Sequence, residues 1–437
     1  MKILLVRPKF FSLVANLEPL GLEYLGGALR EEGIPYEIWD EFQAPFALRF
    51  TRLRRKIRRE RFTAVGFSVN ANTADEVREK ARALKAEFPR LTVLVGGPEA
   101  EVNYRDFCTE GVDFVCYDYG VETFRAMCAS GFDPAAAAAL PGLARRTGDG
   151  WVCNPPAPPV SNFTVQPDRE PMRRSWRRNF IFGKGPHALV KASFSCPFRC
   201  AFCYCTMMNG GVYTQRPLSD VLADIEALEA ERIWLVDDDF LLNRERVVEF
   251  CDLVLKRGVR KQFMAYARAD FPAEHPDLLP LLYRAGFRDI LVGLEAADDA
   301  TLDAYHKETG RAVNEAAIRN LRAAGLVCNG LFVVSHAATR EDFRNLLDFI
   351  RKNRLLWVVF GIFTPYKGSD AYEEYRDRLL TRKAKKLDGL HVTIRPEHMS
   401  KLMFYLRVVL LHAATYPKLL FRILRGTAYD TEKDGWW

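Results

Sequence analysis

Three cysteines carry the clearest chemical signal in the chain. Cys196, Cys200 and Cys203 follow a predicted strand at spacings of four and three residues. A structural zinc site favours four protein ligands in two separated pairs, and Cys205 lies too close to Cys203 to complete a tetrahedron easily. A four-iron four-sulfur cluster takes one thiolate per iron, so three cysteines would leave one iron open to a substrate or cofactor. The spacing therefore predicts an iron–sulfur cluster with an open coordination position.

The first ~130 residues alternate strand-like and helical patterns. Strands separated by helices favour a parallel sheet whose ligands lie beyond the carboxyl ends of the strands. The loops expected there contain Ser68 and Asn70 after one strand, and Gly96 and Gly97 after the next. We expect a ligand to bind between these loops.

Periodicity fails between about residues 133 and 179, where prolines and arginines predict a linker or a strap over the surface. Regular alternation then resumes, with strand-like runs near residues 188–194, 232–236, 262–265, 290–294, 330–334 and 357–363. Six strands alternating with helices predict a second α/β unit, either a barrel or part of one.

These patterns predict an α/β chain of four parts. A Rossmann-like domain is expected over residues 1–135, a linker over 136–185, a partial (β/α)6 barrel over 186–370 and a helical C-terminal region over 371–437. The chain has 437 residues and a formal net charge of +7, which suits anionic small molecules, phosphates or a membrane surface and is too weak to indicate nucleic acid. No signal peptide or membrane-spanning run is recognisable, so we expect a cytoplasmic protein.

The remaining cysteines lack ligand spacing. In a reducing cytosol they are not expected to form disulfides, and we interpret them as small buried hydrophobic residues. Cys205, close to the predicted cluster, is left open. The others are Cys108, Cys116, Cys128, Cys153, Cys251 and Cys328.

The CxxxCxxC spacing, with Phe202 before the last cysteine, resembles the radical S-adenosylmethionine (SAM) superfamily. Further stretches are similar to the branch of that superfamily that carries an N-terminal cobalamin-binding domain. They are residues 19–25, 95–98, 234–240 and 292–295, together with Lys307. The resemblance runs from about residue 1 to 370.

The resemblance implies that Cys196, Cys200 and Cys203 hold a [4Fe–4S] cluster whose open iron takes the amino and carboxylate groups of SAM. An electron from the cluster would cleave SAM to methionine and a 5′-deoxyadenosyl radical, which abstracts hydrogen from the substrate. That electron would come from a donor such as flavodoxin or ferredoxin. The protein's share is orientation and the exclusion of water.

The resemblance also assigns roles to individual side chains. By position, Phe202 would lie near the adenine, and Asp237, Asp238 and Asp239 would replace a Gly-Gly-Glu motif that receives the SAM amino group. Arg268 would meet the carboxylate, and Glu295 the ribose hydroxyls.

Each of these residues has a structural alternative. Phe202 could be a core residue, and the aspartate run could cap a helix. We favour function for Asp237 and Glu295, because acids at the carboxyl ends of barrel strands face the active site. For Arg268, function and an ion pair with Asp270 are equally supported.

Cobalamin is the second cofactor that the resemblance implies, at Ser68, Asn70, Gly96 and Gly97. No histidine precedes His187, so the first domain has no histidine to offer as a cobalt ligand. The sequence also departs from the branch at Glu99, where Gly-Pro-His is frequent. Cobalamin binding is therefore a prediction, and the residues around the predicted site differ from those usual in the branch.

The leading hypothesis is a cobalamin-dependent radical SAM enzyme that methylates an unactivated carbon of a small-molecule or lipid-like intermediate. The alternative within the family is rearrangement, cyclisation or adenosyl-type transfer, with or without bound cobalamin. A methylthiotransferase would need three further cluster cysteines, and a non-catalytic iron–sulfur or zinc module would not cleave SAM.

The chain's final part is basic and apolar. Residues 401–425 contain no acidic residue and five Lys or Arg. Packed terminal helices are favoured over the alternative, a basic amphipathic face for a membrane surface or lipid-like substrate. Under that alternative, Lys418 and Arg422 would contribute to the contact.

Overall fold

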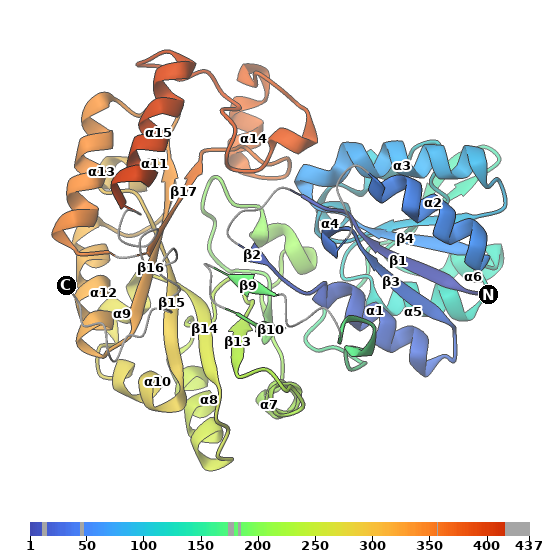
Figure 1. Cartoon of the computed structure of the whole chain (residues 1–437), viewed down its shortest axis with the longest axis horizontal. Coiled ribbons are helices and arrows are strands. Elements are labelled where there is room, and N and C mark those ends of the chain that lie inside the picture. Colours follow the sequence, from blue (N-terminus) through green and yellow to red (C-terminus); the bar gives the residue numbers. More distant parts are fainter. Residues whose placement is uncertain (11–14, 44–47, 174–178, 182–184, 356, 416–437) are drawn as a thin grey trace.

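The computed structural model describes residues 1–10, 15–43, 48–173, 179–181, 185–355 and 357–415. Two α/β units lie side by side, each built on its own sheet (Figure 1). The first, coloured blue to teal, contains the N-terminus, and the second is coloured green to orange.

The first sheet has seven strands in the order β3-β1-β4-β5-β6-β7-β8. Its first five strands in that order are parallel, and the last two pair antiparallel. Because β1 lies between β3 and β4, the winding direction reverses there, and such a reversal creates a crevice at the strand carboxyl ends. The strands are β1 (Ile3–Arg7), β3 (Tyr36–Asp40), β4 (Ala64–Ser68), β5 (Thr92–Gly96), β6 (Phe114–Cys116), β7 (Leu143–Thr147) and β8 (Gly150–Cys153).

Helices cover both faces of this sheet, because successive apolar side chains of β1 are buried on opposite faces. Leu4 and Val6 pack with residues of α2 and α3, whereas Ile3 and Leu5 pack with residues of α1 and α5. Successive strand residues point to opposite faces, so this strand is buried on both sides. The helices are α1 (Leu20–Glu31), α2 (Arg49–Glu60), α3 (Ala74–Glu87), α4 (Pro98–Asn103), α5 (Val121–Ala129) and α6 (Pro134–Ala139).

The β7–β8 hairpin corrects one expectation. The first domain was expected to end near residue 135, but its sheet continues to Cys153. Sequence periodicity missed the hairpin because its strands are only five and four residues long and bury few side chains: Leu143 and Ala144 are buried in β7, and no residue is buried in β8. We call the following segment, residues 154–173, the strap; its Phe163 and Val165 are buried.

The second sheet consists of six parallel strands in chain order. All six predicted strands are present, and among the described residues the sheet remains open, with β10 and β17 at its edges. The strands are β10 (His187–Val190), β13 (Arg232–Leu235), β14 (Gln262–Arg268), β15 (Phe287–Glu295), β16 (Val327–Val334) and β17 (Trp357–Ile362).

The helices that connect these strands cover the outer face of the sheet (Figure 1). Along β13, Ile233 and Leu235 point to this helical layer, whereas Trp234 points to the other face. The helices are α7 (Leu218–Glu226), α8 (Arg244–Lys256), α9 (Asp270–Glu274), α10 (Leu279–Ala285), α11 (Asp299–Ala304), α12 (Arg311–Ala323) and α13 (Arg340–Lys352).

The inner face of the second sheet packs against the first unit. Trp234 belongs to one buried cluster with Tyr24 of α1 and Phe163 of the strap. The rings of Tyr24 and Phe163 stack with centroids 3.5 Å apart, and the Tyr24 hydroxyl donates to Asp224 of α7 at 3.2 Å. The two units therefore share a packed interface.

Short elements complete the fold. β2 (Ala15–Asn16) pairs with β9 (Phe180–Ile181), and β11 (Ser193–Phe194) pairs with β12 (Thr214–Gln215). After β17 come α14 (Asp370–Tyr375) and α15 (Lys401–Thr415), the described part of the predicted helical end. Lys418 and Arg422 lie outside the described residues. Within the described residues, no helix is long and apolar enough to cross a membrane.

Candidate functional site

The cysteine loop runs from β11 to the short helix η7 (Cys205–Gly211). Two backbone hydrogen bonds hold it: the Ala201 amide donates to the Tyr305 carbonyl at 3.0 Å, and the Ala371 amide donates to the Ala201 carbonyl at 2.9 Å. A third closes the loop on itself, from the Cys203 amide to the Cys200 carbonyl at 3.0 Å. The loop is therefore anchored between the end of α11 and the start of α14.

The donor set on this loop fits a cluster. Cys196, Cys200 and Cys203 are each half-buried, and none forms a disulfide. Among the described residues no group of three His, Cys, Asp or Glu could hold a metal ion. Thiolates that do not converge on a single ion are still compatible with a cluster, because each thiolate binds its own iron. Burial raises the pKa of Cys200, while the nearby cations Lys307 and Arg268 oppose that rise. Positive groups at this position would stabilise an anionic cluster.

Arg268 links the cysteine loop to the second sheet. Its Nε donates to Asp270 at 3.0 Å, so the ion pair considered from the sequence is present. Its Nη1 lies 3.9 Å from the Cys200 Sγ, and its guanidinium lies 3.7 Å from the centroid of the Phe198 ring. Arg268 therefore has both a structural partner and a position beside the predicted cluster.

Glu295 is the second predicted residue that the fold places beside the cysteines. It ends β15 with a left-handed φ of 57° and is buried, and its Oε1 accepts from the Lys307 Nζ at 3.0 Å. Arg268 Nη2 donates to the Lys307 carbonyl at 2.6 Å. A Cβ at Gly293 would lie 2.5 Å from the Glu295 Oε1 and 2.9 Å from the Lys307 Nζ. Gly293, which the sequence reasoning missed, therefore leaves the space that the ion pair occupies.

The three aspartates after β13 have different surroundings. Asp237 is buried, and its Oδ1 accepts from the Ala192 amide at 2.6 Å, so it fastens the start of the cysteine segment. Asp239 is buried, burial raises its pKa to about 7, and its Oδ1 has no hydrogen-bond partner among the described residues. Asp238 is exposed, and its charge acts on Cys196, Cys203 and Cys205.

The sequence favours a functional role for Asp237, but these surroundings favour Asp238 and Asp239 instead. The Asp237 carboxylate already has a backbone partner, whereas the Asp239 Oδ1 has none among the described residues and Asp238 is exposed. The Asp238 carboxylate also hydrogen-bonds with the Cys205 thiol, and Cys205 hydrogen-bonds with Cys203, lowering the pKa of Cys203. Cys205 therefore adjoins a predicted cluster ligand rather than lying in the core.

Phe202 lies in an aromatic cluster at the same end of the sheet. Its ring meets Tyr305 edge-on with centroids 5.2 Å apart, and Tyr305 stacks on Phe363 at 5.7 Å. Phe202 is only partly buried in this cluster. It therefore combines the core role with an accessible ring face, and Tyr305 is a neighbour that sequence spacing did not indicate.

The first domain brings its four predicted residues together, since Ser68 pairs with Gly96 where β4 and β5 end. Gly97 has a left-handed φ of 100°, and a Cβ there would lie 2.8 Å from the Ser68 Oγ and the Val69 amide nitrogen. Asn70 begins the adjacent turn, where its backbone N–H donates to the Thr73 Oγ1 at 3.0 Å. Gly96 is less constrained, since its nearest neighbour would be 3.5 Å from a Cβ. These loops end β4 and β5, beside the winding reversal.

The loops of the first domain meet the second unit close to the cysteines. The Asn209 amide of η7 donates to the Glu101 Oε1 at 2.5 Å, and the Asn103 Nδ2 donates to the Lys367 carbonyl at 3.0 Å. Glu99 is buried and Glu101 half-buried, and burial raises the pKa of each to about 7. The helix that follows the predicted cobalamin loop of β5 therefore contacts the short helix that follows the predicted cluster loop.

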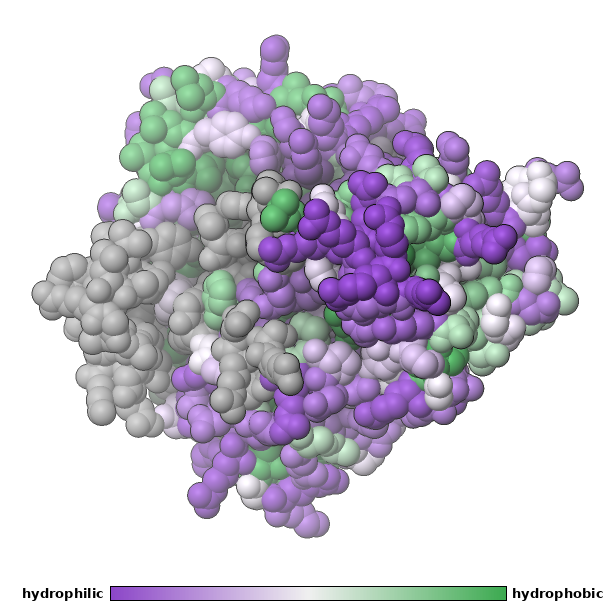
Figure 2. Space-filling model, turned by 45° about the vertical axis from the view of Figure 1, so that its right-hand side comes forward, coloured by the Kyte–Doolittle hydropathy of each residue, from purple (hydrophilic) through white to green (hydrophobic). Residues whose placement is uncertain are grey.

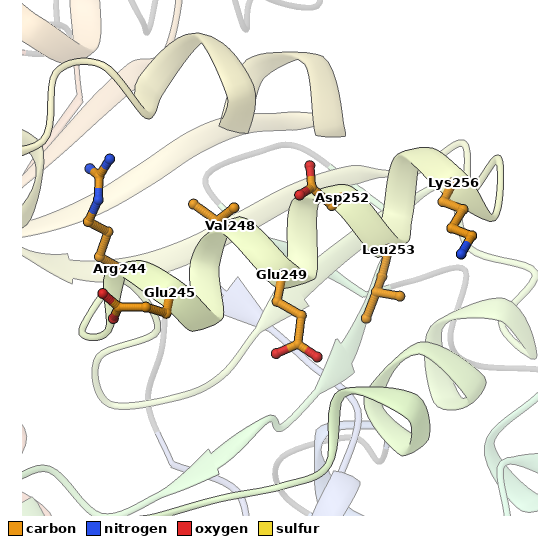
Figure 3. A pocket seen from close by; sticks show the side chains of 7 residues that line it. All are labelled: Arg244, Glu245, Val248, Glu249, Asp252, Leu253 and Lys256. Atoms are coloured by element: carbon orange, nitrogen blue, oxygen red, sulfur yellow. The ribbon is translucent and has the colours of Figure 1, made fainter.

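Figure 3 shows a separate pocket on the outer side of the second unit. Its lining residues all belong to α8, and two of them, Val248 and Leu253, also pack against the core of the second unit. They are Arg244, Glu245, Val248, Glu249, Asp252, Leu253 and Lys256. The pocket lacks cysteines and aromatic residues, and none of the predicted site residues lines it.

The two domains match known families. Residues 10–127 match the B12 binding domain, and residues 190–350 match the radical SAM superfamily. The chain is therefore a radical SAM enzyme of the branch that carries an N-terminal B12-binding domain. The predicted family and enzyme class are confirmed, and the two domains agree with the predicted cofactors: a [4Fe–4S] cluster, SAM and cobalamin.

Individual relatives cover most of the chain. It is 24% identical to the hopanoid C-3 methylase of Methylococcus capsulatus, over 96% of this chain and 81% of that protein. It is 23% identical to the anaerobic magnesium-protoporphyrin IX monomethyl ester cyclase of Rubrivivax gelatinosus, over 92% and 75% respectively. The radical SAM methyltransferase TsrM from Kitasatospora setae, solved with cobalamin and a [4Fe–4S] cluster, has the same fold, with a TM-score of 0.67. Its identity is 21%, over 86% of this chain and 74% of that chain.

Proposed function

We propose that the chain is a cobalamin-dependent radical SAM methyltransferase that transfers a methyl group to an unactivated carbon of a small-molecule, lipid-like biosynthetic intermediate. The observation that carries the proposal is the contact of α4, which follows the β5 loop, with η7, which follows the cysteine loop, and with the Lys367 carbonyl. When bound, the cluster and SAM supply a radical, and cobalamin supplies the methyl group. Both reactive centres would have to lie close to one substrate carbon, and this interface would allow that.

The protein's own residues would bind and orient these groups. Cys196, Cys200 and Cys203 would hold the cluster, and Asp238 and Asp239 would receive the positive amino group of SAM. Asp239 supports this role because its buried Oδ1 lacks a partner among the described residues, and a buried carboxylate oxygen without a partner is costly.

The remaining polar residues would fix the rest of SAM and the second cofactor. Arg268 would bind the SAM carboxylate while Asp270 orients its guanidinium. Glu295, held by Lys307, would accept hydrogen bonds from the ribose hydroxyls. Phe202 would contact the adenine, and Ser68, Asn70, Gly96 and Gly97 would bind cobalamin.

A lipid-like substrate is supported by the match to a hopanoid methylase over nearly the whole chain. The reaction also needs an external electron, for which we propose a flavodoxin or ferredoxin. Interdomain contacts such as that of Asn103 with the Lys367 carbonyl would exclude water from the reacting groups.

The test uses reconstituted protein under anaerobic conditions, with iron and cobalt analysis followed by incubation with methyl-labelled SAM, a reductant and a candidate polycyclic lipid. About four irons and one cobalt per chain, with label in the product, would support the proposal. Replacing Cys196, Cys200 and Cys203 with alanine should abolish iron binding, whereas Cys153→Ala, a half-buried cysteine of β8, should not. Iron without cobalt would contradict cobalamin dependence.

A second candidate reaction is ring closure or another rearrangement without methyl transfer. The specific observation in its favour is the match to a cyclase over 92% of this chain. The same incubation separates the two, because a cyclisation would form 5′-deoxyadenosine without transferring labelled methyl groups.

A further inference from the structure

The helix α15 is apolar on two sides. Phe404, Val408 and Leu411 are buried in the core of the second unit, and the Phe404 ring meets Phe343 of α13 edge-on at 5.6 Å. These contacts fix the helix on the protein and confirm that it packs. A helix on a protein surface normally presents polar residues on its opposite side.

The opposite side of α15 presents large apolar side chains instead. Leu402 is 80% exposed, and three further residues, at spacings of four, seven and eight, are 48–60% exposed. Hydrophobic side chains gather at the upper left of Figure 2, where α15 lies in Figure 1. We call this stripe the outer face of α15; it consists of Leu402, Leu406, Val409 and Leu410.

The charged side chains of α15 itself are of one sign. The helix contains Lys401 and Arg407 and no acidic residue. In the sequence, the next acidic residue is Asp430, and Lys418, Arg422 and Arg425 precede it. An apolar stripe on a helix whose charged residues are all basic is complementary to a surface that combines hydrocarbon with negative charge.

We propose that the outer face of α15 docks the enzyme on an anionic lipid membrane. The helix has 15 residues, roughly 22 Å, and its inner side is held by the protein, so the four side chains would enter only the headgroup and upper acyl region. Contiguous exposed apolar residues of this kind mark interaction sites. The contact goes beyond the proposed reaction and does not depend on the substrate.

A second copy of the chain fits the outer face less well than a membrane does. The outer face offers four side chains, against about 20–30 residues per partner in a standard protein interface. Shared basic charge from Lys401 and Arg407 would also repel an identical face across a two-fold axis. A lipid surface needs neither a larger area nor a complementary shape.

The test measures co-sedimentation of the reconstituted full-length protein with phosphatidylcholine vesicles, with and without phosphatidylglycerol. Binding should need the anionic lipid and weaken with salt. The double variant Leu406→Glu/Val409→Glu should bind at least tenfold more weakly. Leu255→Glu is the matched control, since Leu255 of α8 is 44% exposed and lies outside the outer face. Unchanged iron content and thermal unfolding would show that each variant is folded.

Several results would overturn the docking proposal. They are a wild-type protein that does not bind anionic vesicles, a double variant that binds equally, and a wild-type dimer that the double variant converts to a monomer. A chain shortened after Thr415 should still bind; loss of binding would assign the contact to residues 416–437 instead. Failure of methyl transfer with intact vesicle binding would refute only the proposed reaction.

Discussion

Gly293→Ala isolates the role of the Glu295–Lys307 ion pair without removing either charge. The added methyl group would lie 2.5 Å from the Glu295 Oε1, whereas an ordinary contact begins at 3.4 Å. The carboxylate would therefore have to retreat by about 0.9 Å, and the Lys307 Nζ, at 2.9 Å, by about 0.5 Å. Both side chains are buried, so neither can swing into solvent to avoid the methyl group.

The size of the effect follows from the bond that this displacement disturbs. The pair is joined by a charge-assisted hydrogen bond of 3.0 Å, a type of bond that contributes about 1.5–3 kcal/mol. If Glu295 binds the ribose of SAM, displacing it should weaken SAM binding by a similar free energy, or about tenfold to a hundredfold. Iron content should not change, because the methyl group does not reach the cysteines.

The assay is anaerobic calorimetry of SAM binding to reconstituted protein, together with the rate of 5′-deoxyadenosine formation. Gly361→Ala in β17 is the matched control, because the nearest atom to its Cβ would be the Phe332 carbonyl oxygen at 3.8 Å. Alanine is better than glycine within a strand by about 0.5–1 kcal/mol, so this control should be at least as stable as the wild type. Wild-type SAM affinity in Gly293→Ala would refute the role given to Glu295.

Three further substitutions test other parts of the molecule. Gly97→Ala should lower the cobalt retained after desalting and leave iron unchanged, because its Cβ would collide with Ser68 at a left-handed φ; full cobalt retention would contradict the assigned loop. Arg216→Met should lower the thermal unfolding temperature, since it leaves Asp224 charged and buried, at a cost of about 3–5 kcal/mol. Burial raises the pKa of Glu99 to about 7, so the folded state holds a proton that the unfolded state releases, and stability falls as pH rises from about 4.5 to about 7. Glu99→Gln should therefore be more stable than the wild type above pH 7 and equal to it below pH 4.5, as thermal unfolding across pH would show. The charged groups acting on Glu99 are Asp106, Lys367 and Arg78.

The strands could be predicted because their signals are local. Buried parallel strands such as β4 and β15 form short apolar runs bounded by turns, and those runs stand out in the sequence. The β7–β8 hairpin could not, because a two-stranded addition at a sheet edge needs few apolar residues. Its pairing with β6 depends on the neighbouring strand rather than on its own composition.

The site could be predicted only as far as spacing determines it. The three cysteines share one loop because they are close in sequence. The hydrogen bonds of each aspartate after β13, in contrast, depend on partners that are distant in sequence. The Ala192 amide engages Asp237, and nothing local distinguishes that residue from Asp238. Gly293 matters because Lys307, far along the chain, joins Glu295 beside it. Tyr305 matters through its contact with the distant Phe202, and no local pattern reveals either contact.

The strap between the two units limits how these proteins can be recombined. A Cβ at Gly27 of α1 would lie only 1.9 Å from the Gln166 carbonyl oxygen, so strap and helix touch backbone to backbone. The strap's Phe163 also stacks on Tyr24, whose hydroxyl reaches Asp224 in the other unit. A chimera that exchanges only the cobalamin-type domain would thus bring a foreign α1 against this strap. Successful exchange should require α1 and residues 154–173 to be transplanted together.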